Sequence, residues 1–380
     1  MIGDDHLVRR ATQRFVLVVG AGAIGAAVCS TGLNWVGTRD DDDSYRGRSF
    51  PSPVAREIGP AEAEALTLLR RAAAADNATV YEGRKVFGGW SAQGGESVLA
   101  EVGHEPGKGT WLRVMSAGGH SHQARGGRAE IADAGGELDS QALALLTDQY
   151  TLRVADPIRC IGREATVVEA TPIDGDRVAG RFWIDDQSGL LLRHELYDSA
   201  GHAVRSTSFL DLDVVTGSSP PRTLSTTNQS TPQDRGLLDA DDLEDLRDDG
   251  WVLPAVLPSG MVLYRARAVD VDGGEAVHLT YSDGLFSLSL FAQRGQLDAS
   301  ELRGFSAEKV GTAEVHTRSG LYRQVVWAAG DTVYTIVSDT PDTRLMQVVE
   351  VLPHDEPVAG MRSRMVRGIE RMGSWINPFA

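Results

Sequence analysis

The stretch RVAGRFWIDDQSGLLLRHELYDSAGHAVRSTSF, residues 177–209, decides the fold of this chain. Its apolar residues fall at every second position or in short β-branched and aromatic runs, which predicts strands. The sequences DQSG (186–189) and DSAG (198–201) are typical of turns and separate three such runs. Because tight turns join the runs without a crossover helix, the stretch predicts an antiparallel meander rather than a βαβ unit.

The residues before this meander predict helices and further strands. Pro60 begins a predicted helix, AEAEALTLLRRAAAA (61–75), with Leu66 and Leu69 on its buried side. A second, short helix is predicted at 139–150. Predicted strands are TVYEGRKVF (79–87), SVLAEV (97–102), TWLRVMS (110–116), YTLRVA (150–155) and EATVVEATPI (164–173). Residues 88–137 are rich in glycine, so the strand pairing there stays open.

A polar segment divides the chain into two β-rich domains. Residues 216–236 are rich in Ser, Thr, Pro, Gln and Gly and predict a linker. We therefore expect a large domain at 58–215 and a smaller one at 237–354. The smaller domain opens with an acidic helix or turn (238–251) and closes with a helix (342–352). Its predicted strands are MVLYRARAV (261–269), AVHLTYSD (276–283), FSLSLFAQ (286–293), AEVHTR (313–318), LYRQVVWA (321–328) and TVYTIVS (332–338).

The N-terminal segment 1–57 predicts a cytoplasmic stub, a membrane anchor or signal segment, and a linker. Three arginines precede an uncharged run of 24 residues, Phe15–Thr38, and Asp40–Asp43 follow it. Such a run is long enough to cross a bilayer as a helix, and its basic flank stays in the cytoplasm. The body is therefore expected to be extracytoplasmic, anchored through residues 15–38 or exported; cleavage stays open.

A dinucleotide site competes for the same segment. Gly20-x-Gly22-x-x-Gly25 follows the strand-like FVLVV, as in the fingerprint of nicotinamide-binding domains. The context does not fit, because residues 26–38 have no polar face and no alternation of helix and strand follows. An NAD-dependent oxidoreductase remains a remote alternative.

The tail, residues 355–380, predicts a basic amphipathic helix. Its apolar residues recur at steps of three or four, which forms one stripe. The helix either packs on the protein, lies in the membrane interface, or does not form. For the interfacial alternative the candidate residues are Arg362, Met365, Arg367, Ile369, Arg371, Met372, Trp375 and Ile376.

Composition and motifs argue against catalysis and nucleic-acid binding. The formal net charge is −16, whereas nucleic-acid binding needs a basic surface. The chain has two cysteines, and only Cys160 lies outside the apolar segment. His120 and His122 lack supporting metal ligands at a suitable spacing. No G-x-S-x-G elbow is present. We therefore expect no enzyme, no metal and no cofactor.

An open antiparallel sheet with one apolar face can hold a lipid or a peptide. Five residues are candidates to line such a groove: Trp90, Trp111, Met115, Phe182 and Trp183. The competing interpretation is that they fill the core against helix 61–75. Phe182 and Trp183 are neighbours on one strand, so they must face opposite sides of the sheet.

Several stretches resemble the sigma-E regulatory protein family (RseB/MucB). They are LLRRAAAADNATVYEGRKVF (68–87), the meander 177–209, and LPSGMVLYRA (257–266) with AVHLTYSDGLFSLSLFAQ (276–293). The resemblance spans about 58–354, and only loosely 88–137. It implies an α+β, β-rich fold: an open half-barrel of antiparallel strands similar to lipoprotein carriers, and a smaller α/β domain.

The resemblance also implies a function. Members of the family bind the extracytoplasmic domain of a membrane anti-sigma factor, shield it from proteolysis, and release it when envelope lipid is sensed. On that basis the chain is expected to regulate envelope-stress signalling. The alternative on the same fold is a lipid-binding or lipid-carrier envelope protein without a regulatory role. The resemblance defines no sharp motif for the partner contact, so it assigns no binding residue.

Overall fold

The computed structural model describes residues 56–92, 94–107, 109–118, 128–131, 138, 140–215, 234–271, 274–298, 302–356 and 365–366. The predicted anchor or signal segment, the Gly20-x-Gly22-x-x-Gly25 motif and most of the predicted linker and tail lie outside these residues. Among the described helices, none is both long and apolar enough to span a membrane.

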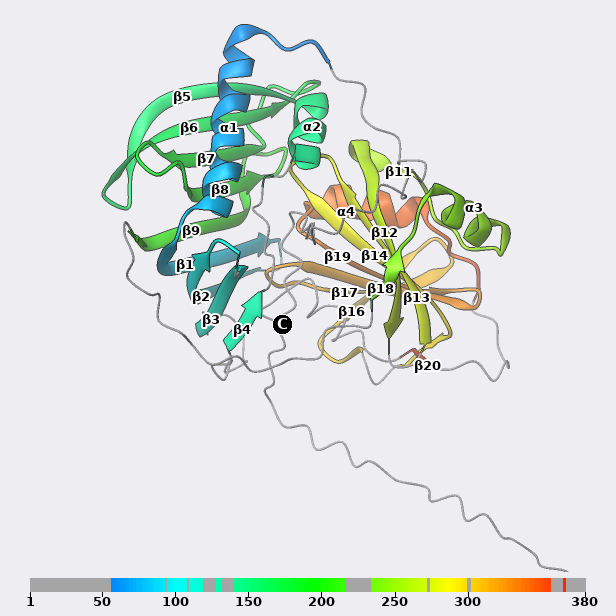
Figure 1. Cartoon of the computed structure of the whole chain (residues 1–380). Coiled ribbons are helices and arrows are strands. Elements are labelled where there is room, and N and C mark those ends of the chain that lie inside the picture. The colour runs from blue at the N-terminus through cyan, green and yellow to red at the C-terminus, as the bar shows by residue number, and fades with distance from the viewer. Residues whose placement is uncertain are drawn as a thin grey trace, which may run out of the picture.

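The first sheet contains nine strands in the order β4-β3-β2-β1-β9-β8-β7-β6-β5, every neighbouring pair antiparallel (Figure 1). The strands are β1 (Tyr81–Ser91), β2 (Gly94–Glu105), β3 (Gly109–Gly118), β4 (Arg128–Ile131), β5 (Tyr150–Cys160), β6 (Arg163–Pro172), β7 (Gly180–Asp185), β8 (Leu191–Tyr197) and β9 (Ala203–Val214). The predicted meander of residues 177–209 forms β7, β8 and β9, and β5 and β6, also predicted as strands, extend it. The sheet is not closed, since β4 and β5 lie at opposite edges.

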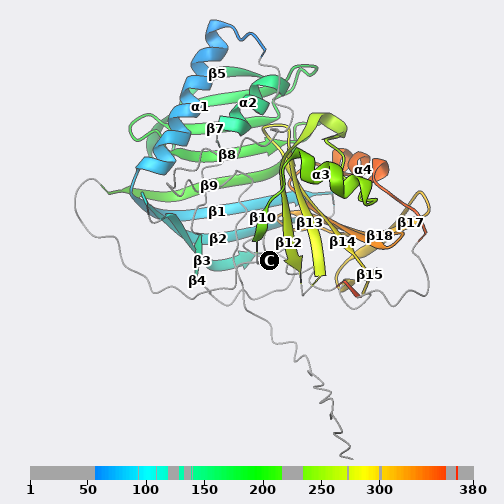
Figure 2. The same ribbon diagram turned by 45° about the vertical axis from the view of Figure 1, so that its right-hand side comes forward.

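Two helices cover one face of this sheet. The helix α1 (Pro60–Ala78) lies across the strands, and α2 (Ser140–Gln149) lies beside it (Figures 1 and 2). The apolar side of α1 is buried, and Leu66 and Leu69 belong to it as predicted. We call the side that these helices cover the covered face and the opposite side the outer face. Residues of the covered face include Leu152, Val168 and Phe182, which share one core with α1.

The second sheet is also antiparallel, in the order β10-β12-β13-β14-β19-β18-β17-β16. Its strands are β10 (Asp234–Leu237), β12 (Met261–Val271), β13 (Gly274–Ser282), β14 (Ser287–Arg294), β16 (Ser306–Val310), β17 (Ala313–Arg318), β18 (Arg323–Ala329) and β19 (Thr332–Ser338); β11 (Val256–Leu257) pairs with β12. The helices are α3 (Ala240–Asp248), η1 (Pro258–Gly260) and α4 (Asp342–Val351). A capping box at Asp239 and Asp242 begins α3, which explains why the acidic stretch is helical.

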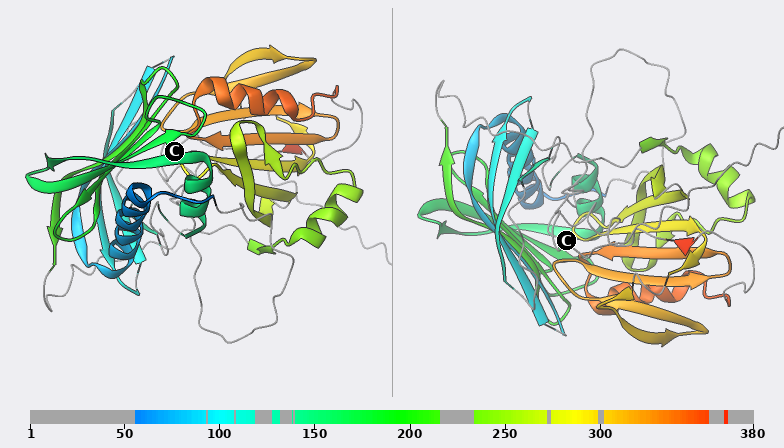
Figure 3. Two further views of the ribbon diagram at one scale, coloured as in Figure 1. Left: turned by 90° about the horizontal axis from the view of Figure 1, so that it is seen from above. Right: turned by 90° about the horizontal axis from the view of Figure 1, so that it is seen from below.

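The fold class predicted from the sequence is confirmed: the described chain is mostly β, with two open antiparallel sheets and few helices. The second sheet lies on the covered side of the first (Figure 3). In the glycine-rich region, β2 and β3 are longer than predicted. In the tail, Met365–Val366 forms a two-residue strand, β20, parallel to β15 (Gln296–Leu297), and this pair departs from the predicted helix. The rest of that predicted helix is not described.

Candidate functional site

The turn between β13 and β14 joins the second sheet to the first. This turn, Ser282–Ser287, presents Gly284 to the backbone of Leu146 at the core of α2. Gly284 has φ +90°, and a Cβ there would overlap that backbone, so the position requires glycine. Beside it, the Cδ1 atom of Leu285 lies 2.5 Å from the place where Gly180 of β7 would carry a Cβ. Two glycines therefore let the turn approach the covered face closely.

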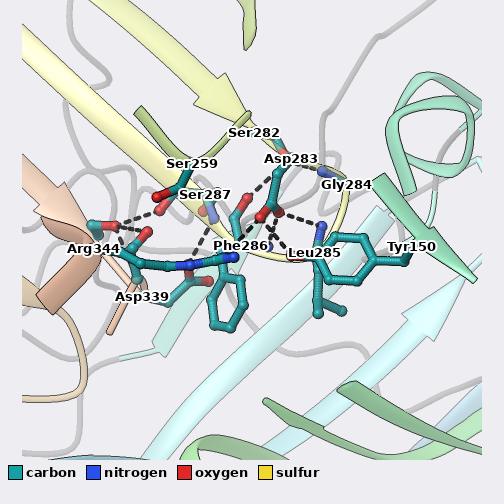
Figure 4. A network of polar contacts seen from close by, with 12 residues as sticks. Tyr150, Ser259, Ser282, Asp283, Gly284, Leu285, Phe286, Ser287, Asp339 and Arg344 are labelled. Atoms are coloured by element: carbon teal, nitrogen blue, oxygen red, sulfur yellow. Dashed lines mark hydrogen bonds and ion pairs between the residues drawn. The ribbon is translucent and has the colours of Figure 1, made fainter. Parts of the chain in front are cut away.

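Asp283 at the tip of this turn is buried and bonded from three directions (Figure 4). Its Oδ1 atom accepts the backbone N–H groups of Leu285 at 2.9 Å and Phe286 at 2.7 Å, which fix the turn. Its Oδ2 atom accepts the Tyr150 hydroxyl of β5 at 2.6 Å and lies 3.2 Å from Nη1 of Arg344 in α4. Burial, together with the Asp283 charge, raises the pKa of the Tyr150 hydroxyl well above its ordinary value. The phenol therefore stays protonated and donates.

A second carboxylate, Asp339, lies close by. Its Oδ1 atom accepts the backbone N–H of Ser287 at 2.7 Å, and its side chain is 93% hidden from solvent, with 7% exposed. Burial raises the pKa of Asp339 to about 6, despite the opposing effect of Arg205 and the Ser287 bond. The junction thus contains an acid whose charge changes near neutral pH.

The turn between β17 and β18 makes a second junction with the first sheet. The backbone N–H of Leu321 donates to Oε2 of Glu96 on β2 at 3.0 Å. Arg205 of β9 lies with its guanidinium 4.0 Å from the centre of the Tyr322 ring and donates to the Leu321 carbonyl at 3.3 Å. Gly89 of β1 meets the backbone of Leu321, where a Cβ would come within 2.7 Å of the carbonyl oxygen. Two hairpin turns therefore hold the sheets together.

Between these junctions lies a narrow cleft with a cavity volume of about 30 Å³. Phe182 and His194 stack in its wall with ring centres 4.4 Å apart. The wall is apolar on the helix side, and the turn contributes both polar and apolar side chains. Its residues are Leu138, Ala142, Leu145, Phe182, His194, Leu196, Arg205, Tyr264, Ser282, Gly284, Leu285, Phe286, Ser287 and Asp339. Such a mixed wall suits an amphipathic ligand or a peptide segment.

Metal chemistry has no candidate group within the described residues. None of their His, Cys, Asp and Glu side chains gather in threes at metal-binding positions. The buried acids of the junction are each bonded to backbone or to a partner side chain, as in Asp283. The arrangement can therefore hold two sheets in a fixed relation, and change it when these bonds change.

The five predicted groove residues do not share one face. Phe182 is buried on the covered face and lines the cleft, whereas Trp183 is on the outer face with the Arg193 guanidinium 5.0 Å from its ring centre. Trp90, Trp111 and Met115 also lie on the outer face, as the strand alternation and register require. The cleft therefore includes Phe182 alone, and lipid or peptide binding at the other four residues stays a prediction.

Sequence reasoning did not single out the residues that make the junction, Tyr150, Asp283, Asp339 and Arg344. A usable signal was present: Asp283-Gly284 between two alternating runs is a strong hairpin sequence. What the sequence does not reveal is that this hairpin tip meets the first sheet, because the partners are separated by 133 residues.

The model of the MucB/RseB N-terminal domain matches residues 114–233. No curated protein matches the chain. Among solved structures, MucB in complex with MucA(peri) is 19% identical, with a TM-score of 0.44, over 75% of this chain and 96% of that chain. The Pseudomonas aeruginosa MucA/MucB complex is 19% identical, with a TM-score of 0.40, over 75% and 96%. The LolA superfamily protein NE2245 from Nitrosomonas europaea is 8% identical, with a TM-score of 0.17, over 73% and 96%. The family match confirms the resemblance predicted from the sequence.

Proposed function

Because the chain carries a region that matches the MucB/RseB N-terminal domain, we propose that it is an extracytoplasmic regulator of envelope-stress signalling. In this proposal it binds the extracytoplasmic domain of a membrane anti-sigma factor and changes that factor's exposure to proteolysis. The observation that carries the proposal is the family match over residues 114–233, which spans β3 to β9. Attachment to the membrane through residues 15–38, or export, belongs to the same proposal.

The junction supports a regulator in physical terms. Two sheets that are held together by two hairpin turns can adopt more than one position relative to each other, provided that the bonds between them are few and specific. The bonds at the first junction centre on one carboxylate, Asp283, and those at the second on Arg205 and Glu96. A ligand that binds one arrangement more tightly shifts the balance between them.

Lipid is the ligand that the cleft wall fits best. Seven of its residues are apolar: Leu138, Ala142, Leu145, Phe182, Leu196, Leu285 and Phe286. The cavity of about 30 Å³ must widen to admit an acyl chain, which would then cover this apolar wall, while Arg205 and His194 lie in the same wall beside a head group. This observation also favours the second candidate function, a lipid carrier without a regulatory role.

The test is capture of the tagged full chain from detergent-solubilised membranes after cross-linking, with identification of bound proteins and lipids. We expect an anti-sigma factor in the captured complex, and we expect added lipid to release it. A lipid bound in stoichiometric amount with no protein partner would favour the carrier instead. If neither a protein partner nor a lipid is captured, both proposed functions are refuted.

Two variants connect the result to the cleft. Leu285→Ala enlarges the cleft wall, and Leu237→Ala makes the same chemical change at a side chain that is 59% exposed and outside the cleft. We expect the first variant to alter the lipid concentration needed for release, and the second to behave as the wild-type chain. If both variants release the partner at the same lipid concentration, lipid is not sensed in the cleft.

A further inference from the structure

A row of buried side chains crosses one face of the second sheet. In the strand order β13-β14-β19-β18 the row is His278, Phe291, Thr335 and Val326, and the register makes each residue the direct neighbour of the next. None of the four is more than 8% exposed. We call this side of the sheet the row face. Side chains hidden to this extent are covered from above the sheet.

The helices of the same domain cover the opposite side. Strand alternation places Leu290 and Ile336 on that side, where they are direct neighbours. Both belong to one core with Leu243 of α3 and Leu345 of α4. Since α3 and α4 pack there, the cover of the row face must come from another part of the chain.

The row face combines apolar surface with hydrogen-bonding groups. The rings of His278 and Phe291 stack with centres 4.2 Å apart, and Nε2 of His278 lies 3.1 Å from Oγ of Ser289. The Thr335 hydroxyl is buried and has no hydrogen-bond partner among the described residues. A buried hydroxyl is costly without a partner, so the group that covers it should bring a polar atom. A peptide segment brings polar backbone groups and apolar side chains together.

The C-terminal segment reaches this face through β20. This strand pairs in parallel with β15. Just before β15, Gly295 donates its backbone N–H to the Asp331 carbonyl at 2.8 Å, in the turn between β18 and β19. Leu297 of β15 packs against the same apolar cluster as Val326. The β15–β20 pair therefore lies at one end of the row face.

We infer that the row face is the docking site of the chain's own residues 367–380, which follow β20. An extended segment of this length spans about 46 Å, whereas the four strands of the row span about 15 Å, so the segment is long enough to cross them. Its backbone offers hydrogen-bond partners to the Thr335 hydroxyl. Its large apolar side chains suit the rest of the face; they are Ile369, Met372, Trp375, Ile376 and Phe379.

The β15–β20 pair favours this location over the membrane interface. An interfacial helix would need an uninterrupted helical stretch through residues 362–376 to present one apolar stripe. Met365–Val366 is a strand instead, so the stretch is interrupted near its start. While residues 367–380 lie on the row face, that face is closed to any other chain.

Chemical labelling of histidines tests whether the tail covers the row. In the full chain in detergent, diethyl pyrocarbonate should label His202, whose side chain is 80% exposed, and spare the buried His278. In a chain that ends at Val366, labelling of His278 should rise to a rate close to that of His202. Equal protection of His278 in both chains would overturn the inference, because another part of the chain would then cover the row.

A synthetic peptide of residues 367–380 distinguishes uncovering from unfolding. Added to the shortened chain, it should restore the protection of His278. The matched peptide with Trp375→Ser and Ile376→Ser has the same length and charge and should not restore it. The inference is wrong if the first peptide gives no protection, or if both peptides protect equally.

Vesicles of anionic phospholipid test the membrane interface as the rival location. The full chain reconstituted into such vesicles should keep His278 protected, as it does in vesicles of neutral phosphatidylcholine. A gain of His278 labelling in the anionic vesicles alone would show that the basic tail prefers the membrane, against the inference. None of these measurements depends on the anti-sigma proposal.

Discussion

Removal of the Tyr150 hydroxyl should loosen the first junction while leaving both sheets folded. This hydroxyl donates to Oδ2 of Asp283 at 2.6 Å, both side chains are almost completely buried, and the bond connects β5 to the β13–β14 turn. A hydrogen bond to a charged group contributes about 1.5–3 kcal/mol. With Tyr150→Phe the Asp283 carboxylate keeps Arg344 and its two backbone donors, so we expect a loss near the middle of that range, about 2 kcal/mol.

Amide hydrogen exchange measures this loss where it occurs. A decrease of about 2 kcal/mol in the free energy of opening corresponds to exchange about 30-fold faster. We expect this acceleration at the amides of Leu285 and Phe286 and at the adjoining end of α2. The matched control is Tyr197→Phe, which removes a hydroxyl bonded to Glu195 within the first sheet and should leave the turn unchanged.

A double-mutant cycle with Asp283→Asn tests the assignment of the energy to this pair. If the bond carries the effect, the two substitutions together should cost less than their sum by about 1–2 kcal/mol. Equal exchange in the Tyr150→Phe and Tyr197→Phe chains, or full additivity in the cycle, would refute the reasoning.

Four further perturbations have outcomes that the structure fixes. Burial raises the pKa of Asp339 to about 6, above the ordinary 3.8. The folded state therefore binds this proton more tightly than the unfolded state, and the resulting stabilisation is present at low pH and is lost as the pH rises from about 4 to 6. Thermal unfolding at pH 7 should therefore show a gain in Asp339→Asn of up to about 3 kcal/mol, absent at pH 4. Asp185 behaves in the opposite sense. Burial favours the protonated carboxyl group, but bonds from Arg163 and Ser188 outweigh burial and lower the pKa of Asp185. Its stabilising contribution is therefore lost on acidification, and Asp185→Asn should flatten the acid limb of the stability profile. Leu69→Ala, at a position with no exposed surface, should lower the free energy of unfolding by about 3 kcal/mol in denaturant titrations. Gly284→Ala should separate the turn from α2, seen as faster exchange at Leu146 without loss of strand signal in circular dichroism.

The sequence predicted those parts of the fold that depend on local pattern. The alternating apolar residues of 177–209 and the turns at 186–189 and 198–201 gave the meander, and Leu66 and Leu69 gave the buried side of α1. Residues 88–137 were harder because glycine removes the alternation. Gly88, Gly95 and Gly103 lie in strands, the first two against the ring of Trp90 and the third against the ring of Trp111.

The candidate site was less predictable because its residues come from distant parts of the chain. Trp90, Trp111 and Met115 were grouped with Phe182 for their chemistry, yet alternation places Phe182 alone on the covered face. Which face of a strand is covered depends on where helices and the second sheet pack, and no local pattern encodes that. Tyr150 and Asp283 look ordinary in the sequence, and only their contact distinguishes them.

The position of β1 has a consequence for how the molecule reaches its folded state. This strand is first in the chain order of its sheet but lies in the middle, between β2 and β9, and its partner residue to Tyr81 on β9 is Val214. While β5 to β9 are still being made, the edge of β1 that later pairs with β9 has no partner strand. The β1–β9 ladder can form only when residues more than a hundred positions apart come together, which slows folding. Until then, the unpaired edge of β1 can pair with strands of other chains. Newly made chains should therefore need a chaperone that keeps them from aggregating, or dilution, until β9 can pair with β1.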